Sequence, residues 1–409
     1  MNNKSQSPIL YESNAIKQTH PLHLYHLAKA FKLSPKEPNN ARVLELACAS
    51  GGNLLPMAYY LQSHFVGIDI SEQEIALALD ASLMLNLKNI EFKAQSVVDF
   101  KASQPFDYII CHGLYSWVAP PVRESILKIC QQYLSDDGIA YISYNTYPGW
   151  VIGNSLRDLL LLSAKSQSSI NNKLTQVHAL MKSLSIGLSQ PQSAYEWLLN
   201  EEVKLVSAHS DNQLLHEHLG NAHFPCYFYE FLESVQRYQL HYLCDATFFE
   251  FEDASFEPHY SQLQDLMHNR RFRSSLLSKK SVNKANVQNM KAAYGSLASQ
   301  ICPNPVVPPK PQASLLARFQ VSQQPHVTNI HHENILLTPI AQAIFPFLDG
   351  QHDFESLKSI VKQYIDAGEL VLVDSLQQSI LDPSHQENQL NVILQETLLL
   401  LATRYLIHV

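Results

Sequence analysis

The sequence predicts an α/β fold with a doubly wound, mostly parallel seven-stranded sheet, a helical middle region and a smaller C-terminal module. Three observations support this prediction. Strand-like and helix-like segments alternate over residues 1–145. The segment 107–111 (DYIIC) is a continuous apolar run, which is typical of a strand buried on both faces. A proline-rich stretch, 302–311, separates the C-terminal part from the rest and predicts a semi-rigid linker.

In the first part, apolar β-prone runs alternate with stretches that have helical spacing or are rich in Ala and Leu. The expected strands are 42–48, 64–70, 89–94, 107–111 and 138–144, and the expected helices are 52–62, 72–85 and 122–134. Ligands on such sheets bind beyond the carboxyl ends of the strands.

After Gly149 the pattern becomes mainly helical. Helices are expected at 155–163, 172–184, 195–200 and 225–238. Two later strands, 240–246 and 272–277, are expected to return to the first sheet, which makes 166–221 a helical insertion. In the C-terminal part, helices at 338–348, 354–368 and 388–405 favour a compact helical or winged-helix-like module.

Composition excludes several classes of protein. Hydrophobic residues make up 46% and charged residues 16% of the chain, which is typical of a globular protein. The formal net charge of -8 argues against a dedicated nucleic-acid binder. Six cysteines without CxxC spacing favour buried free thiols. The N-terminus lacks the apolar run of a signal peptide, and no run reaches the roughly 18 residues of a membrane span, so we expect a cytoplasmic protein without membrane insertion.

The stretch 42–53 (RVLELACASGGN) is a strand that runs into a loop of small residues. Gly51 and Gly52 allow the backbone to approach a ligand closely, and Ala47, Ala49 and Ser50 are nearly as small. The helix that follows directs free amides at this position, which favours an anionic group. On the loop alone, a glycine pair that only lets the helix pack against the strand is an equally good interpretation.

Asp69, at the end of the second strand, can accept hydrogen bonds from the two hydroxyls of a ribose. The GxGxxG motif of nicotinamide enzymes is broken, because Ala47 and Ala49 occupy its first two glycine positions. Glu45 would also repel a pyrophosphate. A cofactor that carries both an ammonium and a carboxylate suits the site better, and S-adenosylmethionine has both groups.

Three further strand ends carry polar or aromatic residues. Ser96 and Val97 follow the third strand, at a position where an adenine edge could be bound. The fourth and fifth strands are followed by HGLYSW (112–117) and YNTYPGW (144–150). Aromatic rings at such a rim can stack on a substrate, hold a cation or exclude water. A packed aromatic rim without a chemical role is the alternative.

Together, ELACASGGNLLPMA (45–58), GIDIS (67–71), HGLYSWV (112–118) and YNTYPGW (144–150) resemble class I S-adenosylmethionine-dependent methyltransferases with a methyltransferase regulatory domain. That group includes rickettsial-type protein-lysine methyltransferases that act on outer-membrane proteins. The resemblance implies a cofactor-binding core at 1–165, a regulatory-type region at 166–300, a linker at 301–313 and a C-terminal module at 314–409.

The resemblance also implies roles for individual residues, and no metal ligand is among them. The residues around the methionine part of the cofactor would be Glu45, Ala47, Gly51 and Asn53, with Ser50 beside them. Asp69 with Ile70 would hold the ribose, Ser96 and Val97 the adenine, and His112 would lie beside the sulfonium. The acceptor channel would be formed by Tyr115, Trp117, Asn145 and Tyr147, with Tyr11 and His20 from the N-terminal lid.

The leading functional hypothesis is therefore methyl transfer to lysine side chains of a protein, with a homodimer as the expected assembly. A small-molecule methyltransferase and an inactive binding or regulatory protein on the same fold are the alternatives. Other features have ordinary interpretations. The histidines 20, 23 and 26, and 216 and 218, are expected at the surface or rim, and Arg270, Arg271 and Arg273 at a solvated or salt-bridged edge.

Overall fold

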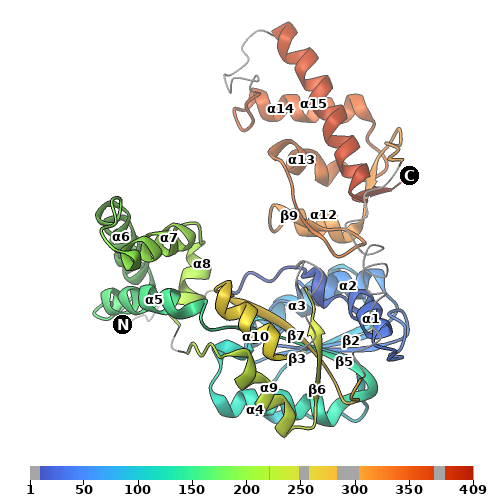
Figure 1. Cartoon of the computed structure of the whole chain (residues 1–409). Coiled ribbons are helices and arrows are strands. Elements are labelled where there is room, and N and C mark those ends of the chain that lie inside the picture. Colours follow the sequence, from blue (N-terminus) through green and yellow to red (C-terminus); the bar gives the residue numbers. More distant parts are fainter. Residues whose placement is uncertain (1–9, 221, 248–257, 283–303, 373–382, 409) are drawn as a thin grey trace, which may run out of the picture.

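A seven-stranded sheet forms the centre of the larger lobe (Figure 1). The computed structural model describes residues 10–220, 222–247, 258–282, 304–372 and 383–408. The strands are β1 (Arg42–Leu46), β2 (His64–Asp69), β3 (Ile90–Ala94), β4 (Phe106–Cys111), β5 (Leu134–Asn145), β6 (His241–Asp245) and β7 (Phe272–Ser278). Their order is β3-β2-β1-β4-β5-β7-β6, and only β7 runs antiparallel to its neighbours. The doubly wound, mostly parallel sheet is confirmed.

Helices cover both faces of this sheet (Figure 1). The first face packs against α1 (Pro21–Ala30), α2 (Leu54–Tyr60) and α3 (Glu72–Met84), and the second against α4 (Pro120–Tyr133) and α9 (Phe228–Arg237). All six residues of β4 are buried, because this strand lies inside the sheet with a helical layer on each side. The apolar run 107–111 therefore predicts its environment correctly.

The middle region is helical. It comprises α5 (Trp150–Ala164), α6 (Ile170–Gly187), α7 (Ala194–Ser207), α8 (Asp211–Gln213) and the π-helical turn η4 (Leu214–His218). Leu156, Leu160, Val177 and Val203 are buried in a hydrophobic cluster of its own. From there the chain passes through α9, β6, α10 (Pro258–Met267) and β7. Both late strands return to the main sheet, as expected from 240–246 and 272–277.

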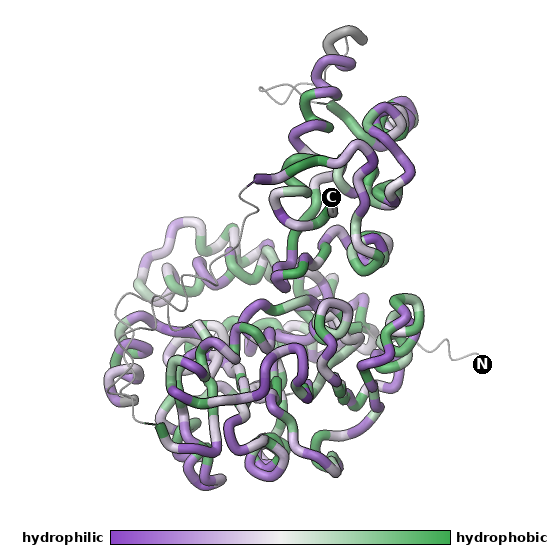
Figure 2. The backbone as a smooth tube through the Cα atoms, turned by 90° about the vertical axis from the view of Figure 1, so that its right-hand side faces the viewer, coloured by the Kyte–Doolittle hydropathy of each residue, from purple (hydrophilic) through white to green (hydrophobic). Residues whose placement is uncertain are grey.

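The C-terminal module is a second lobe that stands apart from the sheet in both views (Figure 1, Figure 2). Its elements are β8 (Gln312–Ala313), α12 (Leu315–Val321), β9 (His326–Thr328), β10 (Asn334–Leu336), α13 (Pro339–Ile344), η7 (Phe345–Phe347), α14 (Phe354–Asp366), α15 (Pro383–Thr403) and β11 (Ile407–His408). The predicted helix 338–348 divides into α13 and the 3-10 turn η7, where Pro346 has no amide to continue the α-helix. The predicted linker 301–313 is described from residue 304 onward.

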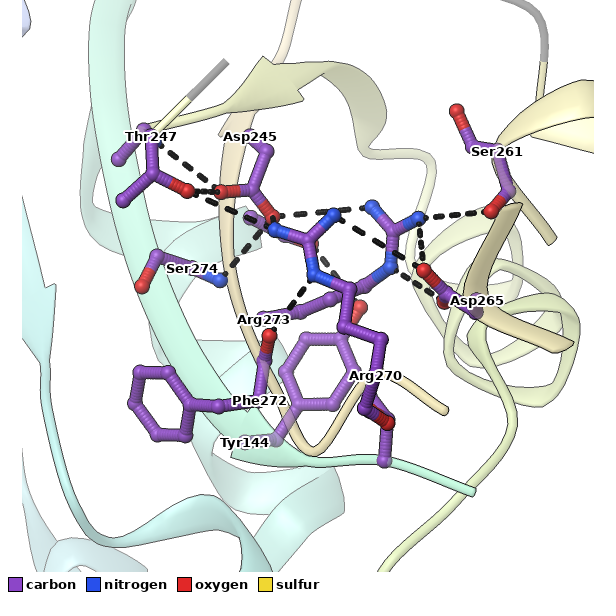
Figure 3. Close-up of polar contacts among 12 residues, drawn as sticks. Tyr144, Asp245, Thr247, Ser261, Asp265, Arg270, Phe272, Arg273 and Ser274 are labelled. Atoms are coloured by element: carbon purple, nitrogen blue, oxygen red, sulfur yellow. Dashed lines mark hydrogen bonds and ion pairs between the residues drawn. The ribbon is translucent and has the colours of Figure 1, made fainter. Parts of the chain in front are cut away.

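Buried ion pairs hold β7 against α10 and β6 (Figure 3). Arg273, 2% exposed, donates from Nε and Nη2 to the two oxygens of Asp265 at 2.7 and 2.9 Å. Arg270 Nη2 lies 3.1 Å from Asp245 Oδ2, and Arg271 pairs with Glu202. The salt-bridged interpretation is thus correct, whereas a solvated position is wrong for Arg273, because β7 is an internal strand.

Five cysteines are buried free thiols, namely Cys48, Cys111, Cys130, Cys226 and Cys244. This agrees with the expectation from their spacing, and Cys302 lies outside the described residues. In the part of the chain that the structure describes, none of the helices combines the length and apolar character that crossing a bilayer requires.

Candidate functional site

The loop between β1 and α2 has an unusual backbone. Ala47 (φ +59°), Ala49 (φ +46°) and Gly51 (φ +79°) all adopt positive φ. Side-chain-bearing residues rarely do so, and such strain persists where surrounding contacts fix the chain. Here the Cys48 amide donates to the carbonyl of Ile68 at 3.0 Å, and the Ala49 amide donates to Asp69 Oδ2 at 3.0 Å. The loop is therefore tied to the carboxyl end of β2.

Glu45 carries a buried carboxylate oxygen without a partner. Its Oε1 accepts from Asn53 Nδ2 at 2.7 Å, while Oε2 makes no hydrogen bond among the described residues. Burial raises the pKa of Glu45 to about 8, against the opposing effect of the Asn53 hydrogen bond. Buried acceptors are nearly always paired in folded proteins, so this oxygen marks a position for a donor or cationic ligand.

The N-terminal segment lies across the same loop. The Gly52 amide donates to Ser13 Oγ at 2.9 Å, and the Tyr11 amide donates to Glu74 Oε1 at 2.6 Å. A Cβ on Gly52 would collide with the Ser13 carbonyl. The bare backbone at Gly52 thus makes room for the N-terminal segment, where the sequence analysis expected a ligand.

The next two strand ends carry an acid and exposed apolar side chains. Asp69 Oδ1 accepts from the Ser71 amide at 2.9 Å, and the neighbouring Ile70 is 78% exposed. Beyond β3, Ser96 accepts from the Val98 amide at 3.2 Å and so caps the 3-10 turn η2 (Val97–Asp99). Val97 is partly buried against the core. Because β2 and β3 are adjacent, these groups lie at one edge of the sheet.

His112 follows β4 and is held in its neutral form. Its Nδ1 lies 3.1 Å from the Tyr141 hydroxyl, which in turn donates to Ser274 at 2.9 Å. Its ring also lies 5.9 Å from that of Phe272, centroid to centroid. Burial lowers the pKa of His112 to about 4. The imidazole is thus uncharged at neutral pH.

Asn145, Trp117 and Tyr147 are joined through a residue that the sequence analysis did not select, His223. Asn145 Nδ2 lies 2.9 Å from His223 Nε2, and His223 Nδ1 lies 2.8 Å from Asn154 Oδ1. Asn154 Nδ2 donates to the Tyr147 hydroxyl at 3.0 Å. The Trp117 ring stacks on His223 at 4.4 Å. This connected group, called the Asn145 relay below, comprises Asn145, His223, Asn154 and Tyr147.

Two predicted channel residues are buried. Tyr115 is buried in the core, with its ring 5.4 Å from Phe231 and 5.9 Å from Tyr144. His20 is 8% exposed, accepts from the Leu22 amide at 3.2 Å and packs 5.1 Å from the His332 ring.

The expected surface or rim location is wrong for three histidines. His20 and His23 are buried, as is His218, because each packs beneath a second element of the fold.

Three family models match the chain. A methyltransferase domain matches residues 37–203, a predicted methyltransferase regulatory domain matches 210–279, and a PKMT C-terminal winged helix domain matches 309–406. The uncharacterized protein RP028 of Rickettsia prowazekii is 35% identical over 238 residues, which are 58% of this chain and 95% of RP028. The chain belongs to the S-adenosylmethionine-dependent methyltransferases that carry a regulatory domain.

Other similar proteins differ from this chain in length or sequence. Uncharacterized protein RP789 of the same organism is 38% identical over 282 residues, which are 65% of this chain but 51% of RP789. The chain thus spans about half of RP789. PKMT2 from Rickettsia typhi, also solved in complex with AdoHcy, has the same fold, with a TM-score of 0.83 at 23% identity over 97% of this chain and 99% of PKMT2.

Two residues of the site, His223 and His332, could not be identified from the sequence, because the fold brings them to their partners from distant parts of the chain. His223 and His332 lie 78 and 279 residues from the side chains that they contact, Asn145 and Asn53. No local spacing connects such pairs. His223 does lie inside the range 210–279 that matches the regulatory domain.

Proposed function

We propose that the chain is an S-adenosylmethionine-dependent methyltransferase that acts on lysine side chains of a protein. The observation that carries the cofactor assignment is the buried, unpartnered Oε2 of Glu45 at the end of β1. The ammonium of the methionine part supplies the charge and the N–H donor that this oxygen lacks. Asn53, which holds the other oxygen, is then a positioning residue.

The adenosine part fits the neighbouring strand ends. Each Asp69 oxygen accepts one backbone amide and retains a lone pair for a ribose hydroxyl. Ile70 and Val97 provide apolar surface for a flat base, and Ser96 shapes the turn beside it.

When bound, S-adenosylmethionine supplies an electrophilic methyl group. Near it, the neutral His112 avoids placing a second positive charge, because burial keeps its pKa at about 4. The acceptor amine has to lose its proton, and a lysine has a pKa of about 10.4 in water. We assign Asn145 to orienting this nitrogen, and the rings of Trp117 and Trp150 to excluding water, which lowers the pKa of the amine. Tyr147 acts through the Asn145 relay.

A protein acceptor is supported by the PKMT winged helix model and by the fold shared with PKMT2 of Rickettsia typhi. The accessory helices and the second lobe offer more surface than a small acceptor needs. We further propose that the acceptor is an outer-membrane protein and that the enzyme acts as a homodimer. We also propose a cytoplasmic location, because buried free thiols suit a reducing compartment.

Labelled S-adenosylmethionine and fractionated bacterial lysate test the proposal. We expect label on outer-membrane proteins and, by mass spectrometry, added methyl groups on lysine. Asp69→Ala should abolish transfer, whereas Asp80→Ala, on the exposed side of α3, should not. Label on metabolites would instead support a small-molecule methyltransferase. Absence of cofactor binding in calorimetry would support the inactive binding protein.

A further inference from the structure

Beyond the cofactor site, three potential metal ligands meet where the helical middle region joins the sheet. His209 lies just beyond the end of α7, and Glu217 and His218 belong to η4. One ligand atom from each of the three side chains lies within 4.8 Å of the other two. We call these residues the His209 cluster. From these contacts we propose that the His209 cluster binds a divalent transition-metal ion, with Zn²⁺ as the best-matched ion.

His218 provides the main evidence for a metal ion at this site. Its side chain is completely buried, yet neither ring nitrogen makes a hydrogen bond within the described residues. Nδ1 of His209 is also buried without a partner. Buried imidazoles normally have a partner for at least one nitrogen. A metal ion would satisfy one nitrogen on each ring at the same time.

The cluster also has space beside it. His209, Glu217 and His218 line a cavity of about 190 Å³ together with Asn145, Trp150 and Phe272. Structural sites for Zn²⁺ are closed, whereas sites with three protein ligands keep a fourth position for water. The cavity provides room for that fourth ligand.

The ligand atoms of the His209 cluster are of the types that Zn²⁺ prefers. Two imidazole nitrogens and one carboxylate oxygen are a known combination for Zn²⁺, with bonds of about 2.0–2.2 Å. Such ligands lie about 3.4 Å apart around a tetrahedral ion, so the three side chains would have to move closer together by at most about 1.4 Å. Rotation of the Glu217 and His209 side chains, both only partly buried, can provide this movement.

Two arginines lie close to the His209 cluster, and one of them, Arg271, is paired with a carboxylate. Arg271 lines the same cavity, but its guanidinium pairs with both oxygens of Glu202. Arg157 donates to the backbone carbonyls of Glu217 and Gly220 and leaves the Glu217 carboxylate free.

The site would join η4 to the connection between α7 and α8. η4 is a single π-helical turn, and His209 stands in the connection between α7 and α8. A shared ion would fix this wall of the cavity relative to Asn145 and Phe272, which also border it. This inference does not depend on methyl transfer.

Calorimetry and elemental analysis of the full chain, purified without a histidine tag, test the proposal. We expect one Zn²⁺ per chain, micromolar or tighter binding, and a higher unfolding temperature with Zn²⁺ than with a chelator. Co²⁺ should give the visible absorption of a tetrahedral site. His218→Ala and Glu217→Gln should lose both effects, whereas His178→Ala, an exposed histidine paired with Asp211, should keep them.

Two results would overturn the proposal. One is a wild-type chain that neither binds Zn²⁺ nor gains thermal stability from it. The other is unchanged binding in His209→Ala and Glu217→Gln, which would place the ion elsewhere. Glu217→Gln preserves side-chain size, so it remains informative even where His218→Ala fails to fold.

Discussion

Nε2 of His332 lies 2.8 Å from Oδ1 of Asn53, although 279 residues separate them in the chain. His332 is 2% exposed and belongs to the loop between β9 and β10 of the C-terminal module. Asn53 precedes α2, and its amide nitrogen donates to Glu45. The C-terminal module is therefore hydrogen-bonded into the network that holds the proposed cofactor-binding carboxylate. An ion pair between Lys17 and Glu333 at 3.0 Å strengthens the same contact.

The first prediction concerns this contact. His332→Ala should weaken binding of S-adenosylmethionine about 5- to 30-fold, because one buried hydrogen bond is worth about 1–2 kcal/mol and Asn53 becomes less restricted. Isothermal calorimetry measures the change. His352→Ala, a partly exposed histidine of the same module, is the matched control. Equal affinity in the two variants would mean that the module does not support the site.

The second prediction is that Glu45→Gln weakens cofactor binding without lowering the stability of the folded chain. The variant keeps the shape of the side chain but loses its charge, so it should bind the cofactor about 10- to 100-fold more weakly, as expected for a charged hydrogen bond. Without ligand it should be at least as stable as the parent chain at pH 8, because it no longer buries a carboxylate. Calorimetry and denaturant unfolding give the two values. Unchanged affinity would remove Glu45 from the proposed site.

The same pair of proteins gives a pH prediction. Burial raises the pKa of Glu45 to about 8, above the ordinary value near 4.5. Between about pH 4.5 and pH 8, Glu45 therefore keeps a proton in the folded state that it releases in the unfolded state. The stability contributed by Glu45 is fully present below about pH 4.5 and is lost as the pH rises to about 8, with a slope of up to about 1.4 kcal/mol per pH unit. The stability difference between the parent and Glu45→Gln should follow this slope, and a flat difference would contradict it.

The Asn145 relay predicts a separation of kcat from cofactor affinity. His223→Ala leaves Asn145 without its partner, so the rate of methyl transfer should fall about 10- to 100-fold through misplacement of the acceptor. Binding of S-adenosylmethionine should stay within about twofold, since the contacts of His223 among the described residues are with Asn145, Asn154 and the two Trp rings rather than with the proposed cofactor residues. Single-turnover transfer of label measures the rate.

Tyr147→Phe tests the far end of the relay. It removes only the hydroxyl that accepts from Asn154, so its effect on the rate should be smaller than that of His223→Ala. A larger effect would indicate direct contact of Tyr147 with the acceptor.

The buried pair of Arg273 and Asp265 should matter for stability alone (Figure 3). Arg273→Ala leaves the buried Asp265 carboxylate with the longer ion pair to Arg270 (3.8 Å) in place of its two-pronged partner, and should lower the free energy of unfolding by up to about 3–5 kcal/mol. Urea denaturation measures this loss. Arg237→Ala, at an exposed position of α9, should change stability by no more than about 0.5 kcal/mol. A loss below about 1 kcal/mol for Arg273→Ala would show that the pair is largely hydrated.

Much of the core was predictable because its signals are local. The apolar run 107–111 gave a strand buried on both faces, and the motif 45–58 gave the strand, loop and helix of β1 and α2. The position of Asp69 at the end of the strand that follows the Gly51 loop was enough to predict a carboxylate at the carboxyl end of β2. The structure connects these two regions through the hydrogen bond from Ala49 to Asp69.

Predictions failed where burial depends on distant segments. The histidines 20, 23 and 218 were expected at the surface or rim, and all three are buried. Each is covered by another part of the chain, as the contact of His20 with His332 illustrates. Gly52 was read as space for a ligand, whereas Ser13 of the N-terminal segment approaches it.

The sequence by itself determined the doubly wound sheet, the glycine-containing loop and the acidic strand end, because these follow from residue periodicity and backbone freedom within short windows. The tertiary structure alone decided which side chains complete the site. Asn53 with His332, Asn145 with His223 and His209 with His218 meet only after helices and lobes pack together. Contacts of this kind have no sequence period, since their partners are fixed by the burial of apolar surface elsewhere in the fold.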